Sequence, residues 1–254
     1  MSDERLLLHS YLKTLKLPTM RAEYKAIARK CGEGNMPYEG YLQQLAELEV
    51  QHRTAAAVER RLRQAEFPMI KEFSSYKFAD VPKLNKKYVL DLARCQFIDT
   101  KTNLVITGPP GVGKTHLAIG FGREACRRGY KVKFFTTSKL VNTYIEARQE
   151  RTILKLEKNI QRCDLIIIDE LGYIPLDRIG AEHLFGFFSR CYEQTSLIVT
   201  TNLPFSDWPQ IFAEDERLAG ALLDRLTHHV HILEIIADSY RLKSSLEKGK
   251  SKEG

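Results

Sequence analysis

The segment Gly108–Thr115 constrains the fold of this 254-residue chain more than any other part of the sequence. Its residues, Gly-Pro-Pro-Gly-Val-Gly-Lys-Thr, match the P-loop pattern G-x-x-x-x-G-K-T. The apolar run Asn103–Thr107 before it predicts a strand, and the pattern from about Lys114 to Arg128 predicts a helix. From average residue usage, an accidental match in a chain this long occurs on the order of once in a hundred. The segment therefore predicts a strand–loop–helix unit of a parallel α/β sheet.

The P-loop pattern predicts a phosphate site. Glycines let backbone N–H groups converge on an anion at the start of a helix, where the helix dipole also favours negative charge. The Lys114 ammonium is expected to reach the β- and γ-phosphates, and the Thr115 hydroxyl to ligate Mg²⁺. The predicted nucleotide-binding residues are Gly108, Pro109, Pro110, Gly111, Val112, Gly113, Lys114, Thr115 and His116.

A second motif, Asp169-Glu170, follows the apolar run Leu165–Ile168. That run predicts a buried strand, which delivers the two acidic residues to the edge of the sheet where α/β folds bind ligands. Asp169 is expected to hold Mg²⁺ together with Thr115, and Glu170 to polarise the attacking water. Alternatively, the pair only caps the next helix; the P-loop upstream favours catalysis.

Thr200-Thr201-Asn202 ends the next predicted core strand. An asparagine at this position can hydrogen-bond the γ-phosphate or the attacking water. It also favours the turn before Leu203-Pro204, and both roles are compatible.

The pattern of apolar residues divides the chain into two predicted domains, residues 1–66 and 67–254. The first is predicted to consist of helices: one ended by Pro18, one over Thr19–Lys30, and one running from Pro37 towards Leu62. Its small core indicates that it docks on DNA or a partner. The second alternates helices with five near-continuous apolar strands, which favours parallel pairing. The predicted strands are Asn103–Thr107, Val132–Thr136, Asp164–Asp169, Ser196–Thr201 and Val230–Ile235.

Composition limits the functional classes. The formal charge of +7 favours polyanionic partners, nucleic acid above all. A basic cluster in the N-terminal domain supplies the first candidate DNA contacts, with a charged helix surface as the alternative; its members are Arg53, Arg60, Arg61 and Arg63. The five cysteines are scattered, which predicts reduced thiols. No apolar run is long enough to span a membrane and the N-terminus does not resemble a secretory signal, so we expect a cytoplasmic protein. Histidines 228, 229 and 231 lack a carboxylate at helical spacing, which disfavours a metal site there.

Together these motifs resemble the AAA+ ATPases, and five further segments resemble the IstB family, ATP-binding helpers of bacterial insertion sequences related to the helicase loader DnaC. The segments are Gly-Lys-Thr-His-Leu-Ala at 113–118, Ile-Asp-Glu-Leu-Gly at 168–172, Thr-Thr-Asn-Leu-Pro at 200–204, Leu-Leu-Asp-Arg-Leu at 222–226 and Ser-Tyr-Arg-Leu-Lys at 239–243. Arg-Arg-Leu-Arg-Gln-Ala-Glu-Phe-Pro at 60–68 also fits the linker of this family. The resemblance covers nearly the whole chain.

The resemblance implies an AAA+ fold: a parallel five-stranded sheet flanked by helices, with the P-loop strand between the last strand and the strand that ends at Asn202, and no full C-terminal lid. It implies ATP as the nucleotide, Arg225 as an arginine finger acting on a neighbouring subunit, and Arg241 as a sensor of the phosphates. For Arg225 the alternative is an ion pair with Asp224, and for Arg241 an ordinary solvated cation. Two helical stretches between Ser138 and Arg162 resemble the insertion of the initiator and loader branch. Its candidate DNA contacts, equally explained by a solvated face, are Lys139, Arg148, Arg151 and Lys155.

The leading hypothesis is an ATPase that forms a ring or helical oligomer on duplex DNA and remodels it for a cognate transposase. A helicase loader of the DnaC type is the main alternative. A small-molecule kinase is disfavoured because no arginine-rich lid is evident and Glu170 favours water as acceptor. A scaffold that binds nucleotide but barely hydrolyses it is disfavoured by the intact Lys114, Asp169 and Glu170.

Overall fold

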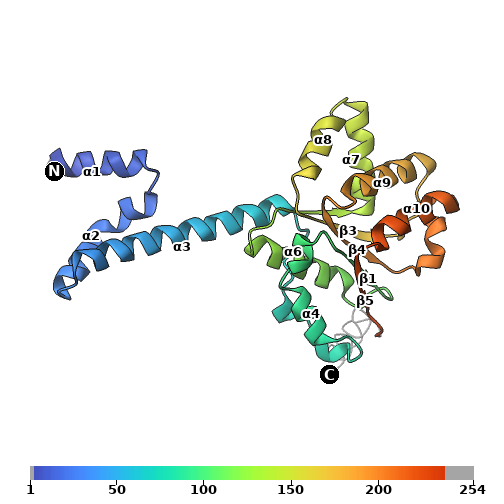
Figure 1. The fold of residues 1–254 in the computed structure, drawn as a ribbon, viewed down its shortest axis with the longest axis horizontal. Coiled ribbons are helices and arrows are strands. Elements are labelled where there is room, and N and C mark those ends of the chain that lie inside the picture. Colours follow the sequence, from blue (N-terminus) through green and yellow to red (C-terminus); the bar gives the residue numbers. More distant parts are fainter. Residues whose placement is uncertain (1–2, 238–254) are drawn as a thin grey trace, which may run out of the picture. The chain divides into compact units, whose positions relative to one another are not determined.

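The computed structural model describes residues 3–237 and divides into two compact units, Met1–Arg60 and Arg61–Gly254 (Figure 1). Helix α3, Tyr38–Ala65, runs across this division. The domain boundary that the sequence predicts between residues 66 and 67 falls just after the end of this helix, and it stays a prediction.

The first unit is helical, as the sequence predicts. It contains α1 (Asp3–Thr14), α2 (Pro18–Glu33) and most of α3. Its small core consists of buried Ile27, Cys31 and Leu45. The carboxylate of Glu49, which is 3% exposed, caps α2 by accepting hydrogen bonds from the backbone N–H groups of Thr19 and Met20 at 2.9 and 3.0 Å.

The second unit is built on a five-stranded parallel sheet in the order β2-β3-β4-β1-β5. The P-loop strand β1 lies between β5 and β4, which confirms the order implied by the resemblance. Strands β1, β2 and β4 have their predicted bounds, while β3 begins one residue later and ends two residues later than predicted, and β5 ends one residue earlier. The observed strands are β1 Asn103–Thr107, β2 Val132–Thr136, β3 Leu165–Leu171, β4 Ser196–Thr201 and β5 Val230–Glu234.

Helices cover both faces of this sheet (Figure 1). Successive strand residues point to opposite faces, so Leu104 and Ile106 pack in the core with α6, and Val105 packs in the other with α7, α9 and α10. The α-helices of this unit are α4 Lys86–Leu92, α5 Gln96–Asp99, α6 Lys114–Arg127, α7 Thr137–Gln149, α8 Ile153–Gln161, α9 Arg178–Cys191 and α10 Glu216–Thr227. Three short 3₁₀ helices complete it: η1 Phe73–Ser75, η2 Phe78–Asp80 and η3 Phe205–Phe212.

The connection between β2 and β3 contains two helices, α7 and α8, which confirms the extra helix predicted there. None of the helices in the described part of the chain is long and apolar enough to cross a membrane. Arg241 and the predicted absence of a C-terminal lid concern residues 238–254, which lie outside the described residues.

Candidate functional site

The P-loop connects the end of β1 to the start of α6, and its glycines have backbone conformations that other residues rarely adopt. Gly113 has φ +98°, and a Cβ atom there would lie 2.8 Å from the ring of Tyr76. Gly108 has φ +147° and lies against the Ile235 carbonyl. This geometry lets the loop turn tightly into α6, whose first N–H groups have no intrahelical acceptor and can therefore bind an anion.

The Lys114 side chain folds back over the loop. Its ammonium donates hydrogen bonds to the carbonyl oxygens of Gly108 and Pro109, at 2.7 and 2.8 Å. The charge therefore lies over the loop itself, at the start of α6.

Thr115 and Asp169 lie in direct contact, although 54 positions separate them in the sequence. The Thr115 hydroxyl lies 2.9 and 3.0 Å from the two carboxylate oxygens of Asp169. Asp169 is only 3% exposed, and burial raises the pKa of its carboxyl group against hydrogen bonds from Thr200 and Thr115 and the charge of Lys114, which lower it. A hydroxyl and a carboxylate side by side are oxygen ligands of the kind Mg²⁺ prefers.

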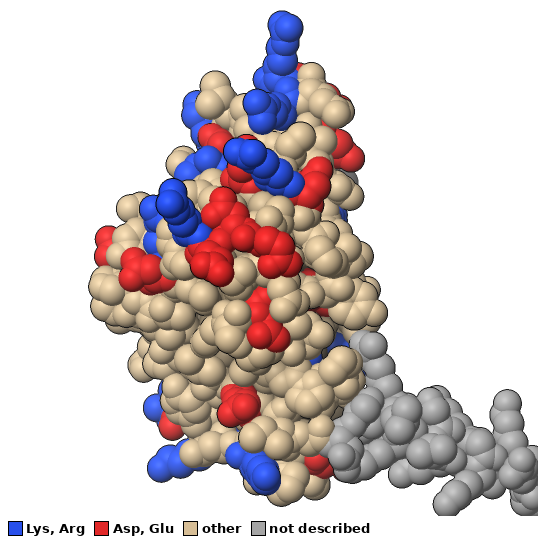
Figure 2. Space-filling view, turned by 90° about the vertical axis from the view of Figure 1, so that its right-hand side faces the viewer, with Lys and Arg blue, Asp and Glu red and all other residues tan. Residues whose placement is uncertain are grey.

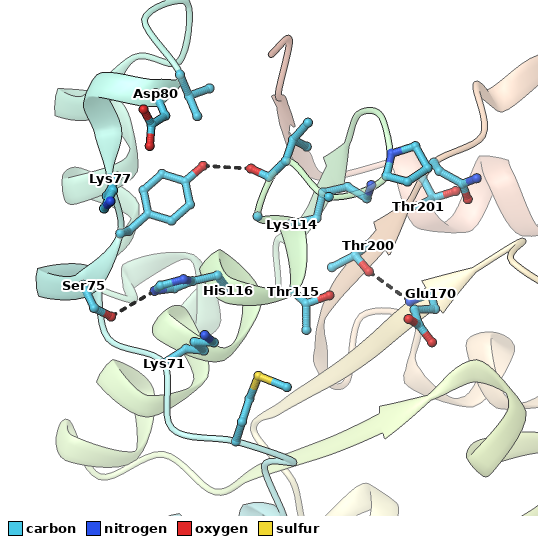
Figure 3. Close-up of a pocket in the computed structure, with 18 of the residues that line it drawn as sticks. Lys71, Ser75, Lys77, Asp80, Lys114, Thr115, His116, Glu170, Thr200 and Thr201 are labelled. Carbon is cyan, nitrogen blue, oxygen red and sulfur yellow. Dashed lines mark hydrogen bonds between the residues drawn. The ribbon is translucent and has the colours of Figure 1, made fainter. Parts of the chain in front are cut away.

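Glu170 follows at an irregularity in β3. The register between β3 and β4 shifts between Ile168 and Leu171, and Glu170 has φ +62°. A left-handed conformation costs a non-glycine residue about 1–2 kcal/mol. The exposed Glu170 side chain lines a cleft in front of the P-loop (Figure 3). Exposed Asn202, just after β4, lines the same cleft.

This cleft has a volume of about 520 Å³, which falls within the range of small-molecule sites. The P-loop residues Pro110–His116 form its floor, and Glu170, Thr200, Thr201 and Asn202 form one side. The opposite side comes from residues 69–81, a segment to which sequence reasoning assigned no role (Figure 3). Its cleft-lining members are Met69, Lys71, Ser75, Tyr76, Lys77, Asp80 and Val81.

His116 joins the P-loop helix to this segment. Its Nε2 atom lies 2.9 Å from the Glu72 carbonyl oxygen and 3.3 Å from the Ser75 hydroxyl, and its ring packs edge-on against Tyr76. Burial lowers the pKa of His116, although its contact with the Glu72 carbonyl opposes this. Through these contacts the half-buried imidazole holds residues 72–76 against the P-loop helix.

Two ion pairs also hold residues 69–81 against α6. The Glu72 carboxylate lies 2.6 Å from Arg123 and 2.7 Å from Arg127, both on α6. These arginines lower the pKa of Glu72, against the effect of burial. The cleft wall and the P-loop helix are therefore one connected structure.

A model of the family described as IstB-like ATP binding protein matches residues 10–248. The chain belongs to this family. It is 36% identical over 247 residues to an IS5376 insertion-sequence protein of Geobacillus stearothermophilus that is named for ATP binding, covering 97% of this chain and 98% of the relative. An IS21 protein of Pseudomonas aeruginosa with a corresponding name is 34% identical, covering 94% of this chain and 89% of the relative.

Solved structures support the AAA+ fold of this IstB-like chain. DnaA from Aquifex aeolicus, solved with AMPPCP, matches with a TM-score of 0.55 and 21% identity, over 73% of this chain and 56% of that chain. DnaI matches with a TM-score of 0.54 and 17% identity, over 70% of this chain and 94% of that chain. The DnaC helicase loader matches with a TM-score of 0.50 and 21% identity, over 59% and 87%.

Arg225 lies far from the P-loop of its own chain. It stands near the end of α10, where the Leu226 carbonyl accepts a hydrogen bond from Asn103, the first residue of β1. The P-loop follows the other end of this five-residue strand. At about 3.3 Å per residue, roughly 15 Å therefore separates the end of α10 from the P-loop. The guanidinium packs over the Phe185 ring at 4.8 Å and donates to the Ala221 carbonyl. None of the ion pairs found among residues 3–237 joins Arg225 to Asp224.

The candidate DNA contacts fall into two kinds. Arg53 has structural partners, because its guanidinium pairs with Glu49 at 3.0 Å and donates to the Lys16 carbonyl. Lys139 pairs with Glu66 at 3.1 Å. The other six have no side-chain ion pair within the described part of the chain, and all except half-buried Arg61 are exposed; they are Arg60, Arg61, Arg63, Arg148, Arg151 and Lys155.

Charge is unevenly distributed on the face drawn in Figure 2. Lysine and arginine side chains gather at its upper end, where Figure 1 places α7 and α8, and acidic side chains gather below them. Three exposed basic residues belong to these elements: Arg148 to α7, Arg151 to the turn after it and Lys155 to α8.

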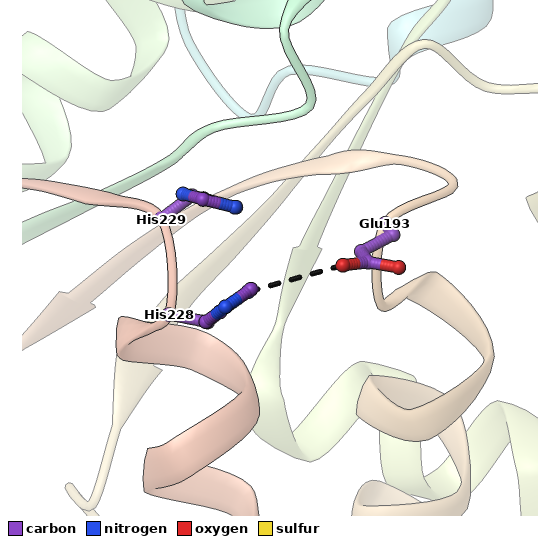
Figure 4. Close-up of side chains that lie close together, drawn as sticks. All are labelled: Glu193, His228 and His229. Carbon is purple, nitrogen blue, oxygen red and sulfur yellow. Dashed lines mark ion pairs between the residues drawn. The ribbon is translucent and has the colours of Figure 1, made fainter.

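A second cluster joins Glu193 to His228 and His229 on the surface (Figure 4). Their potential ligand atoms lie within 4.8 Å of one another, and Glu193 lies 3.8 Å from the nearest His228 nitrogen. Sequence reasoning missed this carboxylate because it comes from the turn after α9, far from the histidines along the chain. All three side chains are exposed, so the contact is that of a surface ion pair, present when His228 is protonated.

Proposed function

We propose that this chain hydrolyses ATP in the presence of Mg²⁺ and assembles on duplex DNA to assist a transposase. The observation that carries the proposal is the contact of Thr115 with Asp169 beneath the P-loop, with Glu170 facing the same cleft. These groups stand where a triphosphate, a divalent cation and an attacking water have to meet.

The residues present fit both the nucleotide and the metal. The glycine-rich turn and the start of α6 offer backbone donors for phosphate oxygens, and the 520 Å³ cleft leaves room for a nucleoside beside them. Thr115 and Asp169 offer neighbouring oxygen ligands. They would hold Mg²⁺, and the chemistry that it would supply there is to offset the negative charge of the phosphates.

Three residues of the chain have the remaining proposed roles in hydrolysis. Lys114 exchanges its bonds to the Gly108 and Pro109 carbonyls for phosphate oxygens when nucleotide binds. Glu170 accepts the proton of the attacking water, and Asn202 orients that water or the γ-phosphate. Both side chains are exposed to the cleft, which gives water access to them.

The remote position of Arg225 favours a shared site. The side chain of an arginine is shorter than β1, which supports a role for the guanidinium at the nucleotide of a neighbouring protomer. Such a finger stabilises transition-state charge and makes hydrolysis depend on assembly. Exposed apolar side chains on α1 and α3, such as Leu7, Tyr11 and Tyr38, support self-association into a ring or helix.

The DNA-binding part of the proposal rests on the exposed basic groups of α7, α8 and the turn between them. Arg148, Arg151 and Lys155 are unpaired cations within the described part of the chain, so they are available to phosphates. Contacts of this kind are independent of base sequence. The Arg60–Arg63 cluster is a second candidate surface.

The choice of a transposase as partner follows the insertion-sequence names of relatives that are 36% and 34% identical. The likeness to DnaC and DnaI, at 21% and 17% identity, supports the fold alone. A helicase loader therefore remains the alternative. A transposase gene next to the gene of this chain favours the first, and binding of a replicative helicase by the purified chain favours the second.

The proposal is tested by measuring ATP hydrolysis with and without duplex DNA while light scattering sizes the complexes. We expect ATP to drive assembly on DNA, and hydrolysis to release it. The proposal fails if ATP leaves both the size of the complexes and the affinity for DNA unchanged. Adding the cognate transposase then tests the partner: ATP-dependent complexes should retain it, and nucleotide-free protein should not.

A further inference from the structure

Thr200 contacts both acidic residues of the candidate site through a single hydroxyl group. Its Oγ1 atom donates to the Asp169 carboxylate at 2.5 Å. The same atom accepts from the backbone N–H of Glu170 at 3.0 Å (Figure 3). Thr200 is 1% exposed, so water does not compete for these bonds. The hydroxyl therefore fixes the relative position of two neighbouring residues that have different proposed roles.

The second of these bonds takes the place of a missing sheet bond. Ile168 pairs with Val199 and Leu171 pairs with Thr201, so two residues of β3, Asp169 and Glu170, face only Thr200 on β4. An extra residue in one strand leaves a backbone group without its usual partner. The Thr200 hydroxyl accepts from that group, the N–H of Glu170, and so supports its left-handed conformation.

This irregularity matters because side chains alternate along a regular strand. In a regular β3, Asp169 and Glu170 would point to opposite faces of the sheet. Instead, Asp169 contacts Thr115 on the P-loop helix, and Glu170 lines the cleft in front of that helix. Both acidic groups thus serve one site because the strand is distorted where Thr200 holds it.

The two residues depend on Thr200 to different degrees. Asp169 has a second hydroxyl partner, Thr115. The Glu170 N–H donates to the Thr200 hydroxyl on β4 at 3.0 Å, and it also contacts the adjacent Asp169 carboxylate, whose pKa it lowers. Removal of the Thr200 hydroxyl therefore takes away the contact that ties Glu170 to β4, whereas Asp169 stays bonded to Thr115.

We propose that Thr200 is a positioning residue, whose hydroxyl holds the Asp169–Glu170 irregularity in the form that aims Glu170 at the attacking water. The proposal deepens the proposed ATPase function and rests on it. Thr200 touches neither water nor phosphate in this role; it acts through Glu170.

Three variants separate this role from a merely structural one. Thr200→Val keeps the shape and removes the hydroxyl, and Thr200→Ser keeps the hydroxyl. Thr195→Val removes another buried threonine hydroxyl, which among the described residues bonds the Cys163 carbonyl alone. We expect Thr200→Val to lower kcat by about 10- to 100-fold, because a small misplacement of a catalytic group has effects of this size. KM for ATP should stay within about threefold, because the P-loop is unaltered. Thr200→Ser and Thr195→Val should retain wild-type kcat.

Combination with Glu170→Gln tests whether Thr200 acts through Glu170. If it does, Thr200→Val should slow the Glu170→Gln enzyme by less than about twofold, because the carboxylate that Thr200 positions is already absent from that enzyme. The proposal is overturned if Thr200→Val has wild-type kcat, or if it lowers kcat equally in the presence and absence of the Glu170 carboxylate.

Amide hydrogen exchange of Glu170, followed by NMR in the full-length nucleotide-free protein, gives a readout that needs no turnover. Thr200→Val should speed this exchange at least about tenfold, because the N–H loses its bond to the buried hydroxyl on β4, while Thr200→Ser and Thr195→Val should not. Unchanged exchange in Thr200→Val overturns the proposal. A different outcome is faster exchange in Thr200→Val with no ATP hydrolysis by the wild-type chain. The proposed ATPase function then fails, and so does the role of Thr200 in hydrolysis, but the support that its hydroxyl gives to the Glu170 backbone is retained.

Discussion

Thr115 and Asp169 share two short contacts, in which one hydroxyl lies 2.9 and 3.0 Å from the two oxygens of one buried carboxylate. The residues come from different elements, α6 and β3, and the parallel sheet brings them together at its carboxyl edge. A buried carboxylate without a cation is costly, because burial disfavours its charged form. In the proposed function, a cation bound beside the pair offsets this cost.

Asp169→Asn should stabilise the nucleotide-free protein while it removes Mg²⁺-dependent nucleotide binding. Burial raises the pKa of Asp169, so this group stabilises the fold below its unfolded pKa, and the stabilisation is lost as pH rises through its folded pKa. Above its folded pKa the carboxylate is charged and costs stability, which asparagine relieves. We expect Tm to rise by about 2–4 °C, the shift that about 1 kcal/mol gives in a domain of this size.

Calorimetry across a pH series checks this expectation. The gap in Tm between Asp169→Asn and wild type should be largest at neutral pH and should shrink as pH falls through the folded pKa of Asp169. Asp91→Asn, a change at an exposed aspartate on α4, should show no such gap. A lower Tm for Asp169→Asn at neutral pH, with Mg²⁺-dependent binding intact, contradicts the assigned role.

Glu170→Gln should retain ATP binding and lose turnover. The side chain keeps its size but no longer accepts a proton, so kcat should fall by about 10²- to 10⁴-fold, the usual contribution of a general base. DNA complexes of this variant should last longer in ATP than those of the wild type. Single-turnover hydrolysis and complex lifetimes measure both effects, with Glu182→Gln on α9 as the control. Normal turnover of Glu170→Gln removes Glu170 as the activator of water.

Arg225→Ala and Lys114→Ala should each abolish hydrolysis and should restore part of it when mixed. A mixed assembly contains some sites with an intact P-loop from one protomer and an intact arginine from the other. At equal amounts and random assembly, about a quarter of the sites are complete, so we expect activity of that order. Absence of recovered activity, in mixtures shown by sizing to co-assemble, counts against a finger acting between subunits.

Replacement of Arg148, Arg151 and Lys155 by alanine should weaken DNA binding equally for all sequences. Each lost phosphate contact lowers the salt dependence, so the slope of log K against log salt should fall by up to about three. Fluorescence anisotropy at several salt concentrations measures this slope. Arg53→Ala is the comparison, because Arg53 already bonds Glu49 and the Lys16 carbonyl. An unchanged slope in the triple variant excludes this surface as the DNA contact.

Sequence patterns predicted the parts of the fold that depend on local order. The glycine-rich loop, the apolar runs of β1, β2 and β4, and the helix after Lys114 are each set by neighbouring residues, so their bounds could be read directly. The strand order followed from the family resemblance and not from the patterns, because pairing between strands depends on residues far apart in the chain.

The parts that escaped prediction are made by contacts over long distances in the chain. Residues 69–81 have no regular apolar period, and they form a cleft wall only because Glu72 and His116 tie them to α6. Thr200 was visible as part of Thr-Thr-Asn, but its bond to the Glu170 N–H depends on the irregularity of β3. Arg53 looked like a surface charge, and its bond to Glu49 could not be inferred from charge alone.

The most direct test of the central claim is equilibrium binding of ATPγS with Mg²⁺ to the full-length protein, measured by calorimetry. We expect saturable binding at one nucleotide per chain, and an affinity at least about tenfold lower for Lys114→Ala, the loss that corresponds to one charge-assisted hydrogen bond. Lys158→Ala, a change at an exposed lysine on α8, should bind as the wild type does. A wild-type chain that binds no nucleotide, or a Lys114→Ala variant that binds it equally well, contradicts the claim that residues 108–115 hold a nucleotide beside Asp169 and Glu170.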